Sequence, residues 1–536
     1  MVLRKILIIL FVTLLCPSFM VGQQKAVRMA VVSDIHIQDT AVVRSMDAEI
    51  HSTRLFNENY FAAITALDNI AEKGIKEVIL PGDLTDNGQE MNVVLVRKML
   101  QSYTDRYGMH FYVMDGNHDP SRPFADKNVK GGLRPWGYEE IHNEWSSFGF
   151  LPRKNYLYWE TPFTTYSYPE YRFDEALKQA SWTNRIYALQ TPDGKSLYKP
   201  FIQEGSYLVE PVKGVWLLAI DASVYHPSKL DGDSIVSFQG ASGGYNEVFK
   251  VKKFLLPWIK KVVKNAKKYH KTLVAFSHYP MADYNSGALE FIGKIAQSGK
   301  FDIHRFPSAE SATLLADAGI TFHLGGHLHM NDDETFVSAK NNRLRNVQVP
   351  TTAGYVPAYK IITLQSGKPV KIETVALNNV AGFDAFFPRY RAEHDSLTAK
   401  GIKNIWDDGI LSAKNYRQFC EWHLRELVRL RYLPGDLKPI ATEKFVPMTA
   451  GQIFAYLGLK PFGKTNWTGF DMIVDFYKLR LGSELALPDI SSERMNQYRM
   501  IVNKGVQMHS QTEFDSFFYN FCGILSAKMK TLQKYY

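Results

Sequence analysis

Five short polar segments, each directly after a run of apolar residues, constrain this chain more than any other feature of its sequence. They are Ser33-Asp34-Ile35-His36, Pro81-Gly82-Asp83, Asp115-Gly116-Asn117-His118-Asp119, Phe276-Ser277-His278-Tyr279-Pro280 and Gly325-Gly326-His327-Leu328-His329. In open α/β sheets, ligands and catalytic groups collect outside the carboxyl ends of the strands. If each apolar run is a strand, the five segments converge on one site.

The pattern of apolar residues indicates that these runs are strands. Short β-rich runs alternate with amphipathic helical patterns from about residue 27 to residue 375, which predicts an α/β layered domain. One helix is expected between Tyr60 and Ile70, with Gly74 as its stop signal, and another at 91–103. The expected strands are 28–33, 77–80, 110–114, 215–220, 272–276 and 320–324.

The polar segments have the composition of a metal centre. Asp-x-His and His-x-His each place two side chains on the same side of an extended segment, so two such pairs can hold metal from opposite sides. Carboxylates can bridge cations, and imidazoles suit zinc, iron, nickel and similar ions. Glycines precede Asp83, Asn117 and His327, where they allow the backbone to turn sharply and approach the site closely.

In content and order these segments resemble the calcineurin-like metallophosphoesterase family, whose pattern is Asp-x-His, Gly-Asp, Gly-Asn-His-Asp/Glu, His and Gly-His-x-His. The resemblance covers about 27–375 and implies a four-layer α/β/β/α sandwich, with two sheets face to face and helices outside. It also implies two metal ions, either divalent or of the iron type, with manganese, zinc, iron and nickel all open. By position, one ion would be held by Asp34, His36 and His329, the other by Asn117, His278 and His327, with Asp83 bridging them.

The resemblance implies hydrolysis of a phosphate ester by a metal-bridging hydroxide. His118 falls where the family has the residue that contacts the phosphate and protonates the leaving group, and Asp86 matches the carboxylate often paired with it. Asn87 stands where the phosphatase branch usually has arginine, which disfavours close kinship with protein phosphatases. Asp119, in place of glutamate, favours a phosphodiesterase, with a phosphomonoesterase of the same family as the alternative.

Two other classes of protein remain open more remotely. Gly240-Ala241-Ser242-Gly243-Gly244 matches the nucleophile motif of serine hydrolases, but the preceding segment is too polar to be the buried strand that this motif requires. A non-catalytic metal-dependent binding protein of the same fold is the second alternative, although every expected ligand and the acid are present. His323 lies inside an apolar run and is interpreted as a core histidine.

The rest of the chain carries no chemical motif. Residues 124–210 are rich in aromatic residues, proline and glycine, and are interpreted as an insertion with long loops in the metallophosphoesterase domain at 25–375. Residues 376–536 are expected to form a second, mostly helical domain. We expect both parts to cover the metal site and to select the leaving group.

The N-terminal residues 1–24 have the pattern of a secretory signal peptide, which predicts a secreted or periplasmic protein without a transmembrane segment after cleavage. Cys16 would permit a lipid anchor, but Leu15 before it disfavours one. Cys420 and Cys522 alone remain, which excludes a disulfide scaffold and a cysteine zinc site and leaves one bridge open.

The net charge of +9 is small for 536 residues, and no nucleic-acid signature accompanies it. The lysines of 250–271 alternate with apolar residues at helical spacing, which predicts the solvated face of an outer helix. The substrate beyond its phosphate ester and the oligomeric state are not indicated by the sequence.

Overall fold

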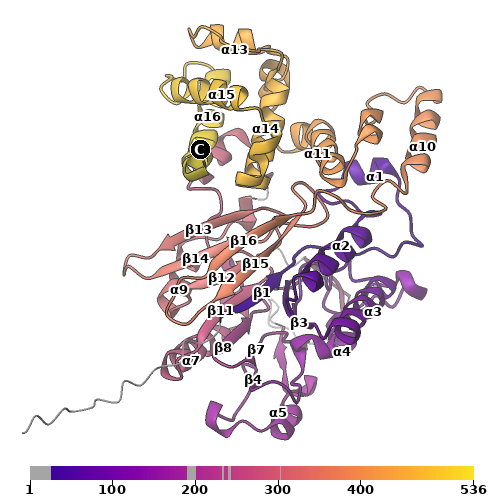
Figure 1. Cartoon of the computed structure of the whole chain (residues 1–536), viewed down its shortest axis with the longest axis vertical. Coiled ribbons are helices and arrows are strands. Elements are labelled where there is room, and N and C mark those ends of the chain that lie inside the picture. The colour runs from indigo at the N-terminus through magenta and orange to yellow at the C-terminus, as the bar shows by residue number, and fades with distance from the viewer. Residues whose placement is uncertain (1–25, 190–200, 232–233, 240–242, 302, 536) are drawn as a thin grey trace, which may run out of the picture.

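The computed structural model describes residues 26–189, 201–231, 234–239, 243–301 and 303–535. Two large β-sheets lie between layers of helices, and a group of helices from the C-terminal part of the chain covers one end of this sandwich (Figure 1). The predicted four-layer α/β/β/α architecture with an additional helical region is therefore confirmed. The predicted signal peptide and Cys16 lie outside the described residues.

The first sheet has five strands in the order β16-β15-β1-β2-β3. Strands β1, β2 and β3 are parallel neighbours, whereas β15 runs antiparallel to β1 and β16 antiparallel to β15. Helices α2 and α3 lie against this sheet (Figure 1). The bounds are β1 Val27–Val31, β2 Glu77–Pro81, β3 His110–Met114, β15 Ala358–Leu364, β16 Lys371–Ala376, α1 Met46–Ile50, α2 Asn59–Glu72 and α3 Glu90–Tyr107.

The second sheet has seven strands in the order β13-β14-β12-β11-β8-β7-β4. Its central strands β8, β11, β12 and β14 are parallel, and helices α7 and α9 pack on it. The bounds are β4 Tyr158–Glu160, β7 Tyr207–Val212, β8 Val215–Ala219, β11 Thr272–Ser277, β12 Phe322–Gly325, β13 Asp332–Val337, β14 Arg343–Gln348, α6 Val248–Val251, α7 Leu255–Lys268, α8 Leu289–Ile295 and α9 Ala309–Ala318.

The predicted elements occur within a few residues of their expected positions. Helix α3 is followed by Gly108, which adopts the left-handed conformation with φ +62° that favours glycine directly after a helix. Helix α7 buries Trp258, Ile259 and Val262 and leaves Lys260 exposed, as its lysine pattern predicts. The spacing of apolar residues is sufficient to predict these helices, because each buries one face against a sheet.

The segment 124–210 contains more regular structure than its sequence indicates. It supplies two short helices, α4 (Tyr138–Glu144) and α5 (Phe173–Gln179), and the small β5–β6 pair (Ile186–Ala188 and Phe201–Gln203). It also contributes β4, and β7 begins inside it, so both belong to an edge of the second sheet. The aromatic residues of this segment pack as core, with Trp159 and Tyr207 fully buried.

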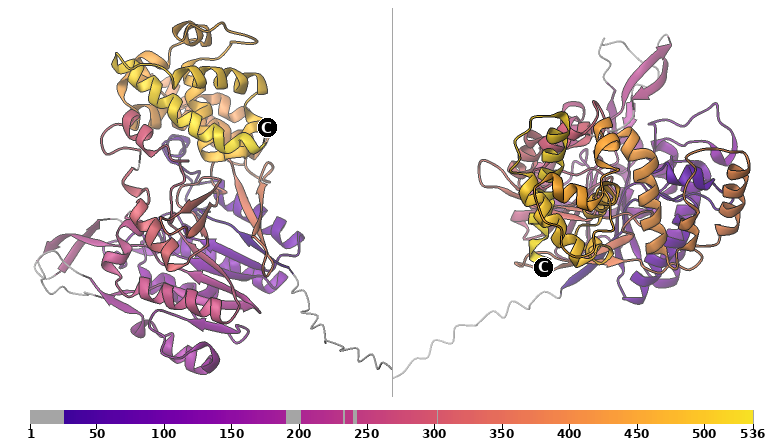
Figure 2. Two further views of the ribbon diagram at one scale, coloured as in Figure 1. Left: turned by 90° about the vertical axis from the view of Figure 1, so that its left-hand side faces the viewer. Right: turned by 90° about the horizontal axis from the view of Figure 1, so that it is seen from above.

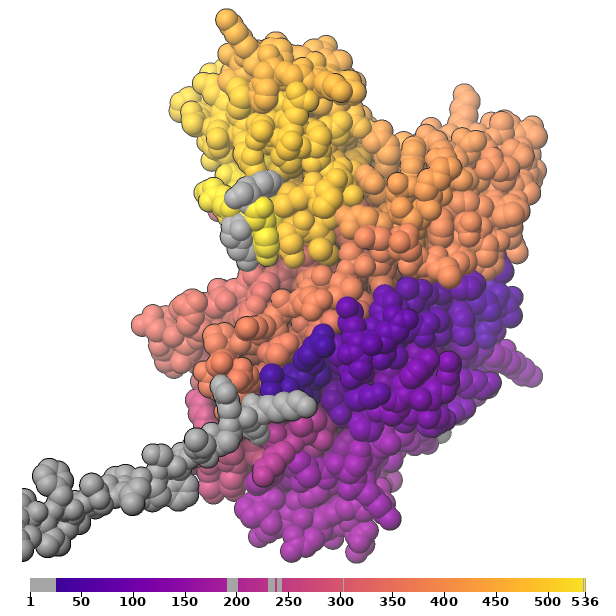
Figure 3. Space-filling view, in the orientation of Figure 1, coloured from indigo at the N-terminus to yellow at the C-terminus, as the bar shows by residue number. Residues whose placement is uncertain are grey.

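The C-terminal helices stack on one end of the sandwich, as the side view and the space-filling view show (Figures 2 and 3). Their buried residues form one continuous hydrophobic cluster with those of the five-stranded sheet. The division into two domains at residue 375 stays a prediction. The bounds are α10 Phe387–Ala399, α11 Tyr416–Leu427, η8 Val428–Tyr432, α12 Leu433–Gly435, α13 Ala450–Tyr456, α14 Gly469–Gly482, α15 Ser492–Gly505 and α16 Glu513–Leu532.

Both remaining cysteines are buried in these helices as free thiols, Cys420 in α11 and Cys522 in α16. Burial raises the pKa of each thiol well above its usual range. Among the described residues, no helix is both long enough and apolar enough to cross a bilayer.

The last helix is attached to the sandwich by close packing and by a buried ion pair. Gly523 of α16 lies against the ring of Phe291 in α8, where an added Cβ would approach the ring to 2.8 Å. Lys528 Nζ lies 3.1 Å from Asp332 Oδ1 at the start of β13, and both side chains are buried. Breaking such a pair leaves a buried charge without compensation.

We therefore expect Lys528→Met to lower the free energy of unfolding by about 3 kcal/mol, because Asp332 loses its buried counter-charge. Chemical denaturation of the variant measures the change. Lys530→Met removes the same charge from the exposed face of the same helix and should have little effect. Adding Asp332→Asn to Lys528→Met should restore much of the stability; equal losses in the single and double variants would contradict this assignment.

Candidate metal centre

The predicted metal ligands come together at the carboxyl ends of five strands. Asp34, Asp83 and Asn117 follow the parallel neighbours β1, β2 and β3 of the first sheet. His278 and His327 follow the parallel neighbours β11 and β12 of the second sheet, and His329 lies two residues further on. The two sheets therefore face each other with their ligand-bearing ends on the same side.

Backbone hydrogen bonds fix these strand ends relative to one another. The amide of Asp34 donates to the carbonyl of Gly82 (3.1 Å), and that of His36 donates to the carbonyl of Asp83 (3.0 Å). Across the two sheets, the His327 amide donates to both carboxylate oxygens of Asp34, at 3.0 and 3.1 Å. The ligand geometry thus depends on main-chain contacts as well as on side-chain packing.

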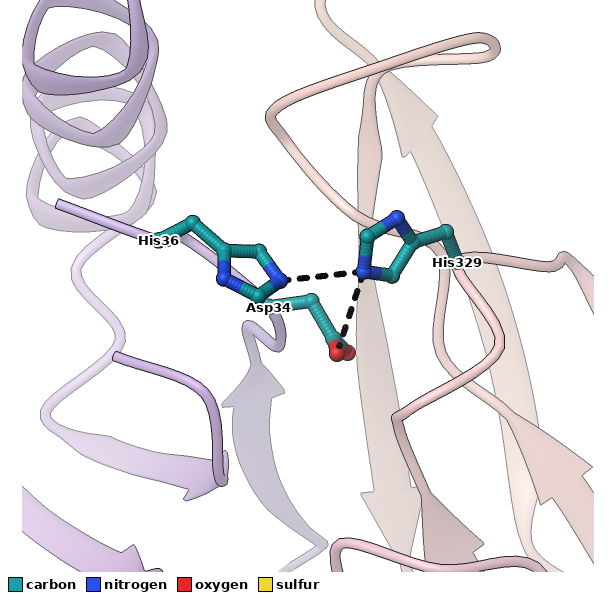
Figure 4. A group of neighbouring side chains, drawn as sticks. All are labelled: Asp34, His36 and His329. Carbon is teal, nitrogen blue, oxygen red and sulfur yellow. Dashed lines mark hydrogen bonds and ion pairs between the residues drawn. The ribbon is translucent and has the colours of Figure 1, made fainter. Parts of the chain in front are cut away.

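The donor atoms form two groups. In the first group, the Nε2 atoms of His36 and His329 are 3.0 Å apart, and His329 Nε2 is 3.5 Å from Asp34 Oδ1 (Figure 4). These three side chains point toward a common centre, and their ligand atoms all lie within 4.8 Å of one another. The arrangement matches the first ligand set that the family resemblance implies.

In the second group, His278 lies at the centre. Its Nε2 atom is 3.1 Å from His327 Nδ1, 3.1 Å from Asn117 Oδ1 and 3.2 Å from Asp83 Oδ2. The same Asp83 oxygen lies 3.7 Å from His36 Nε2 in the first group. Asp83 therefore stands between the two groups, as a bridging carboxylate would.

The electrostatics of the donors follow from burial and from their mutual proximity. Burial, reinforced by the Arg54 charge, lowers the pKa of His329 to about 3 and that of His36 well below its usual range. Burial raises the pKa of Asp34 to about 7. Burial alone would lower the pKa of His278, but the adjacent Asp83 carboxylate raises it to about 9.

This donor set fits two metal ions. His36 and His329 are neutral at physiological pH, so their facing nitrogens at 3.0 Å can offer lone pairs to a cation. Carboxylate, imidazole and amide oxygen together suit zinc, manganese, iron or nickel and do not single out one of them. Two ions would also compensate the buried carboxylates of Asp34 and Asp83.

The backbone around the donors is strained. Asp34, His36, Asp83, His327 and His329 have φ between +43° and +74°, a left-handed region that residues other than glycine adopt uncommonly. Backbone strain of this kind costs of order 1 kcal/mol or more per residue and clusters at functional sites. Its concentration at five of seven predicted ligands indicates that the surrounding fold imposes the geometry.

Three glycines permit the close approach of these segments, as their positions in the sequence predict. A Cβ at Gly116 would lie 2.0 Å from Asp83 Oδ1, and one at Gly326 would lie 2.4 Å from Asp34 Oδ2. At Gly82, which has φ +93°, a Cβ would lie 2.7 Å from His278 Nδ1. None of these positions accepts a side chain without displacing a donor.

His118 lies beside the two groups and is half-buried. Its Nδ1 is 3.1 Å from Asn87 Oδ1, and the other amide atom of Asn87 donates to Asp86 Oδ2 at 3.1 Å. Asp86 in turn accepts hydrogen bonds from Arg54. The Asn87 amide thus links His118 to Asp86, and the ligand atoms of His36, Asp86 and His118 all lie within 4.8 Å of one another.

Asp119 supports the backbone beside the metal donors. Its carboxylate accepts hydrogen bonds from the amides of Leu84 and Thr85, at 2.6 and 2.7 Å, and so holds the turn that follows Asp83.

His323, interpreted from sequence as a core histidine, is fully buried between Ser277 and Asn346. Burial lowers its pKa to about 4, which keeps it neutral.

A cavity of ≈ 550 Å³ opens onto the donors. Asn117, His118, His327 and His329 line it, and so do residues of the C-terminal helices, including Tyr477 of α14. Five cationic side chains contribute to its wall, namely Arg54, Lys300, Arg305, Arg431 and Arg480. Sequence analysis did not identify them, because they are isolated residues in four separate segments and only the fold brings them together.

The serine-hydrolase alternative gains no support from its surroundings. Residues 240–242, including Ser242, lie outside the described residues. The preceding strand, β10 (Ser234–Gln239), pairs with β9 (His226–Asp231) in a two-stranded sheet separate from both large sheets in the described structure. A nucleophile motif instead requires a strand within the central sheet.

Two sheets that present donors for a pair of metal ions at facing strand ends define a dinuclear metallohydrolase. The model of the calcineurin-like phosphoesterase family matches residues 27–331, more than half of the sequence. The chain belongs to this family and is a phosphoric ester hydrolase. The resemblance inferred from the five motifs is thereby confirmed.

Among solved structures, the chain is similar at 11% identity and a TM-score of 0.33 to a dimetal phosphatase from Danio rerio, over 65% of this chain and 98% of that one. A purple acid phosphatase from yellow lupin matches at 11% identity and a TM-score of 0.32, over 66% and 52% of the two chains. GAP50, the anchor in the inner membrane complex of Plasmodium, matches at 12% identity and 0.30, over 66% and 84%. No curated protein sequence matches significantly.

The glycine contacts generate a direct test of the donor geometry. We expect Gly116→Ala and Gly326→Ala to reduce the bound metal per chain, because each added methyl group collides with a carboxylate of the centre. Elemental analysis after dialysis measures the metal content. Gly293→Ala in α8, where an added Cβ meets nothing within 4 Å, is the matched control. Full metal content in the first two variants would contradict this donor geometry.

Proposed function

We propose that this enzyme hydrolyses a phosphodiester at a dinuclear centre formed by the seven predicted ligands. One observation carries the proposal: two groups of metal donors share Asp83 and border a cavity that His118 also lines. When bound, two metal ions supply Lewis acidity toward the phosphate and lower the pKa of water in the site. The identity of the ions, whether manganese, zinc, iron or nickel, is left to metal analysis.

The protein groups have separate tasks in this proposal. His118 is the general acid, and it donates a proton to the leaving-group oxygen from Nε2 while Nδ1 is held by Asn87. Asp86 orients Asn87 and is itself held by Arg54. Asp86 therefore positions His118 indirectly, through Asn87. Arg54 and Arg305 add positive charge beside the donors, since both contribute to lowering histidine pKa values there.

Phosphomonoester hydrolysis is the second candidate, and the cationic wall of the cavity favours it. A monoester phosphate carries more negative charge than a diester and gains more from arginine contacts. The sequence argument for a diester came from Asp119, whose carboxylate supports the turn after Asp83. The choice between the two esters therefore depends on kinetics.

The first experiment is hydrolysis of paired chromogenic substrates, 4-nitrophenyl phosphate and bis(4-nitrophenyl) phosphate, with manganese, zinc, nickel or iron added in turn. We expect turnover to require metal and to be lost with a chelator. A higher kcat/KM for the diester supports the proposal, and a higher value for the monoester selects the alternative. Two bound metals per chain without turnover of either ester would favour a non-catalytic binding protein.

The role of His118 is tested through the leaving group. A general acid contributes 10²–10⁴-fold when the leaving alkoxide is basic and much less when it is a stable phenolate. We therefore expect His118→Asn to lower kcat far more for a methyl ester than for the corresponding 4-nitrophenyl ester. Ser242→Ala, which tests the serine-hydrolase alternative, should retain activity on both. Equal losses for the two esters in His118→Asn would assign this histidine to substrate binding alone.

A further inference from the structure

The cavity wall has one cationic part beside the metal donors and another on the C-terminal helices. The charges of Arg54 and Arg305 contribute to the pKa shifts of the histidine donors, which places them near those donors. Arg431 and Arg480 are not among the leading charges acting on any donor, although both line the same cavity. They come from η8 and α14, which lie outside the family match at 27–331.

Arg480 has no anionic partner among the described residues. Its guanidinium lies 4.9 Å from the centre of the Phe301 ring, and its Nε atom is buried without a hydrogen bond within the described structure. Other arginines of the same helical region are paired, as Arg417 is with Asp489 and Arg494 with Asp475. Arg480 is half-buried, and burying a guanidinium without a counter-ion costs free energy. An anionic ligand would supply the missing counter-charge.

The groups around Arg480 form a preorganised wall. Tyr477, one turn earlier on α14, stacks on Tyr432 at 4.7 Å and on Phe301 at 6.2 Å between ring centres. The Tyr477 hydroxyl is buried without a hydrogen-bond partner in the described structure. Arg431 reaches the same cavity from η8, and its guanidinium donates to the carbonyl of His51. The Phe301 ring thus packs on the Arg480 guanidinium, and a main-chain hydrogen bond fixes Arg431.

The net charge of this part of the wall is positive. Lys300, Arg431 and Arg480 contribute three cationic groups, and Asp436 contributes one carboxylate. The charges of Arg54 and Arg305 act on the histidine donors, whereas Arg431 and Arg480 line the cavity from the C-terminal helices. A ligand with one anionic group would leave Arg480 without a counter-charge.

We propose that Arg480 and Arg431 form a second anion subsite, so that the natural substrate is a phosphate ester whose leaving group carries a further phosphate or carboxylate. The inference rests on the proposed ester hydrolysis and specifies its substrate class. One anionic group lies at the metal centre and is cleaved, while the other is held by the C-terminal helices and remains on the product. Selection of the leaving group then resides outside the part of the chain that performs the chemistry.

A ladder of synthetic esters tests this on the intact, metal-loaded enzyme. Both phosphodiesters and phosphomonoesters are used, so that either ester can be the one cleaved. Alkane-1,n-diol bisphosphates of increasing chain length are compared with the matching alkyl monophosphates, and both compounds are also prepared with a methyl group on one phosphate, which makes that phosphate a diester. The kcat/KM of each compound is measured by release of the leaving alcohol. We expect a ratio of bisphosphate to monophosphate of about 10 to 100 at one preferred length, as for one or two charge-assisted hydrogen bonds. A parallel series of ω-carboxyalkyl phosphates distinguishes a second phosphate from a carboxylate.

Variants assign the effect to Arg480. In Arg480→Gln the ratio should fall toward one, and Arg480→Lys should recover part of it. Arg391→Gln, which removes an exposed arginine of α10, controls for net charge and should keep the wild-type ratio. A ratio near one at every chain length in the wild type, or an unchanged ratio in Arg480→Gln, would overturn the inference while leaving ester hydrolysis intact.

A binding measurement separates this inference from the proposed function. If no ester is turned over, the proposed hydrolysis fails, and isothermal titration with the bisphosphate and monophosphate of the same chain length decides the subsite. Tighter binding of the bisphosphate that is lost in Arg480→Gln supports a second anion subsite even then. Equal affinities of the two ligands reject it.

Discussion

The site depends on the contacts of one buried group, the carboxylate of Asp83. One oxygen accepts the His118 amide at 2.8 Å, and the other lies between His36 and His278 of the two donor groups. Gly116 packs so closely that no side chain could replace it there. A buried carboxylate requires compensation by hydrogen bonds and positive charge. The two sheets bring the amides, the histidines and the implied metal ions to this single anion.

Bringing the donors together around Asp83 also costs free energy of folding. Five donors adopt left-handed backbone conformations, and the imidazoles of His36 and His329 are buried in their neutral form. These features do not stabilise the fold by themselves. The continuous hydrophobic cluster that joins the sheets to the C-terminal helices offsets them. Metal binding would return part of this free energy, because a ligand that binds the native state stabilises it.

Sequence could predict those parts whose signal is local. The strands, the α2 and α3 helices and the convergence of the ligands follow from apolar runs that end in Asp, Asn and His. The Asn87 amide between His118 and Asp86 was not predicted, because the family pattern specifies residue types and not their contacts. Arg480 was missed for a different reason: α14 is buried on most of its faces, and the sequence does not show which of its charged residues borders a cavity.

In the proposed function, the chemistry and the selection of the leaving group belong to different parts of the chain. The family match ends at residue 331, and every donor lies within it, whereas the cavity wall continues to Leu481 on the C-terminal side. Because the helices share one core with the sandwich, the wall they form is fixed relative to the metal centre. A change of leaving-group preference could thus arise from substitutions in α11 or α14 without disturbing Asp83 or its neighbours. The C-terminal helices thus supply part of the wall of the cavity that borders the metal donors.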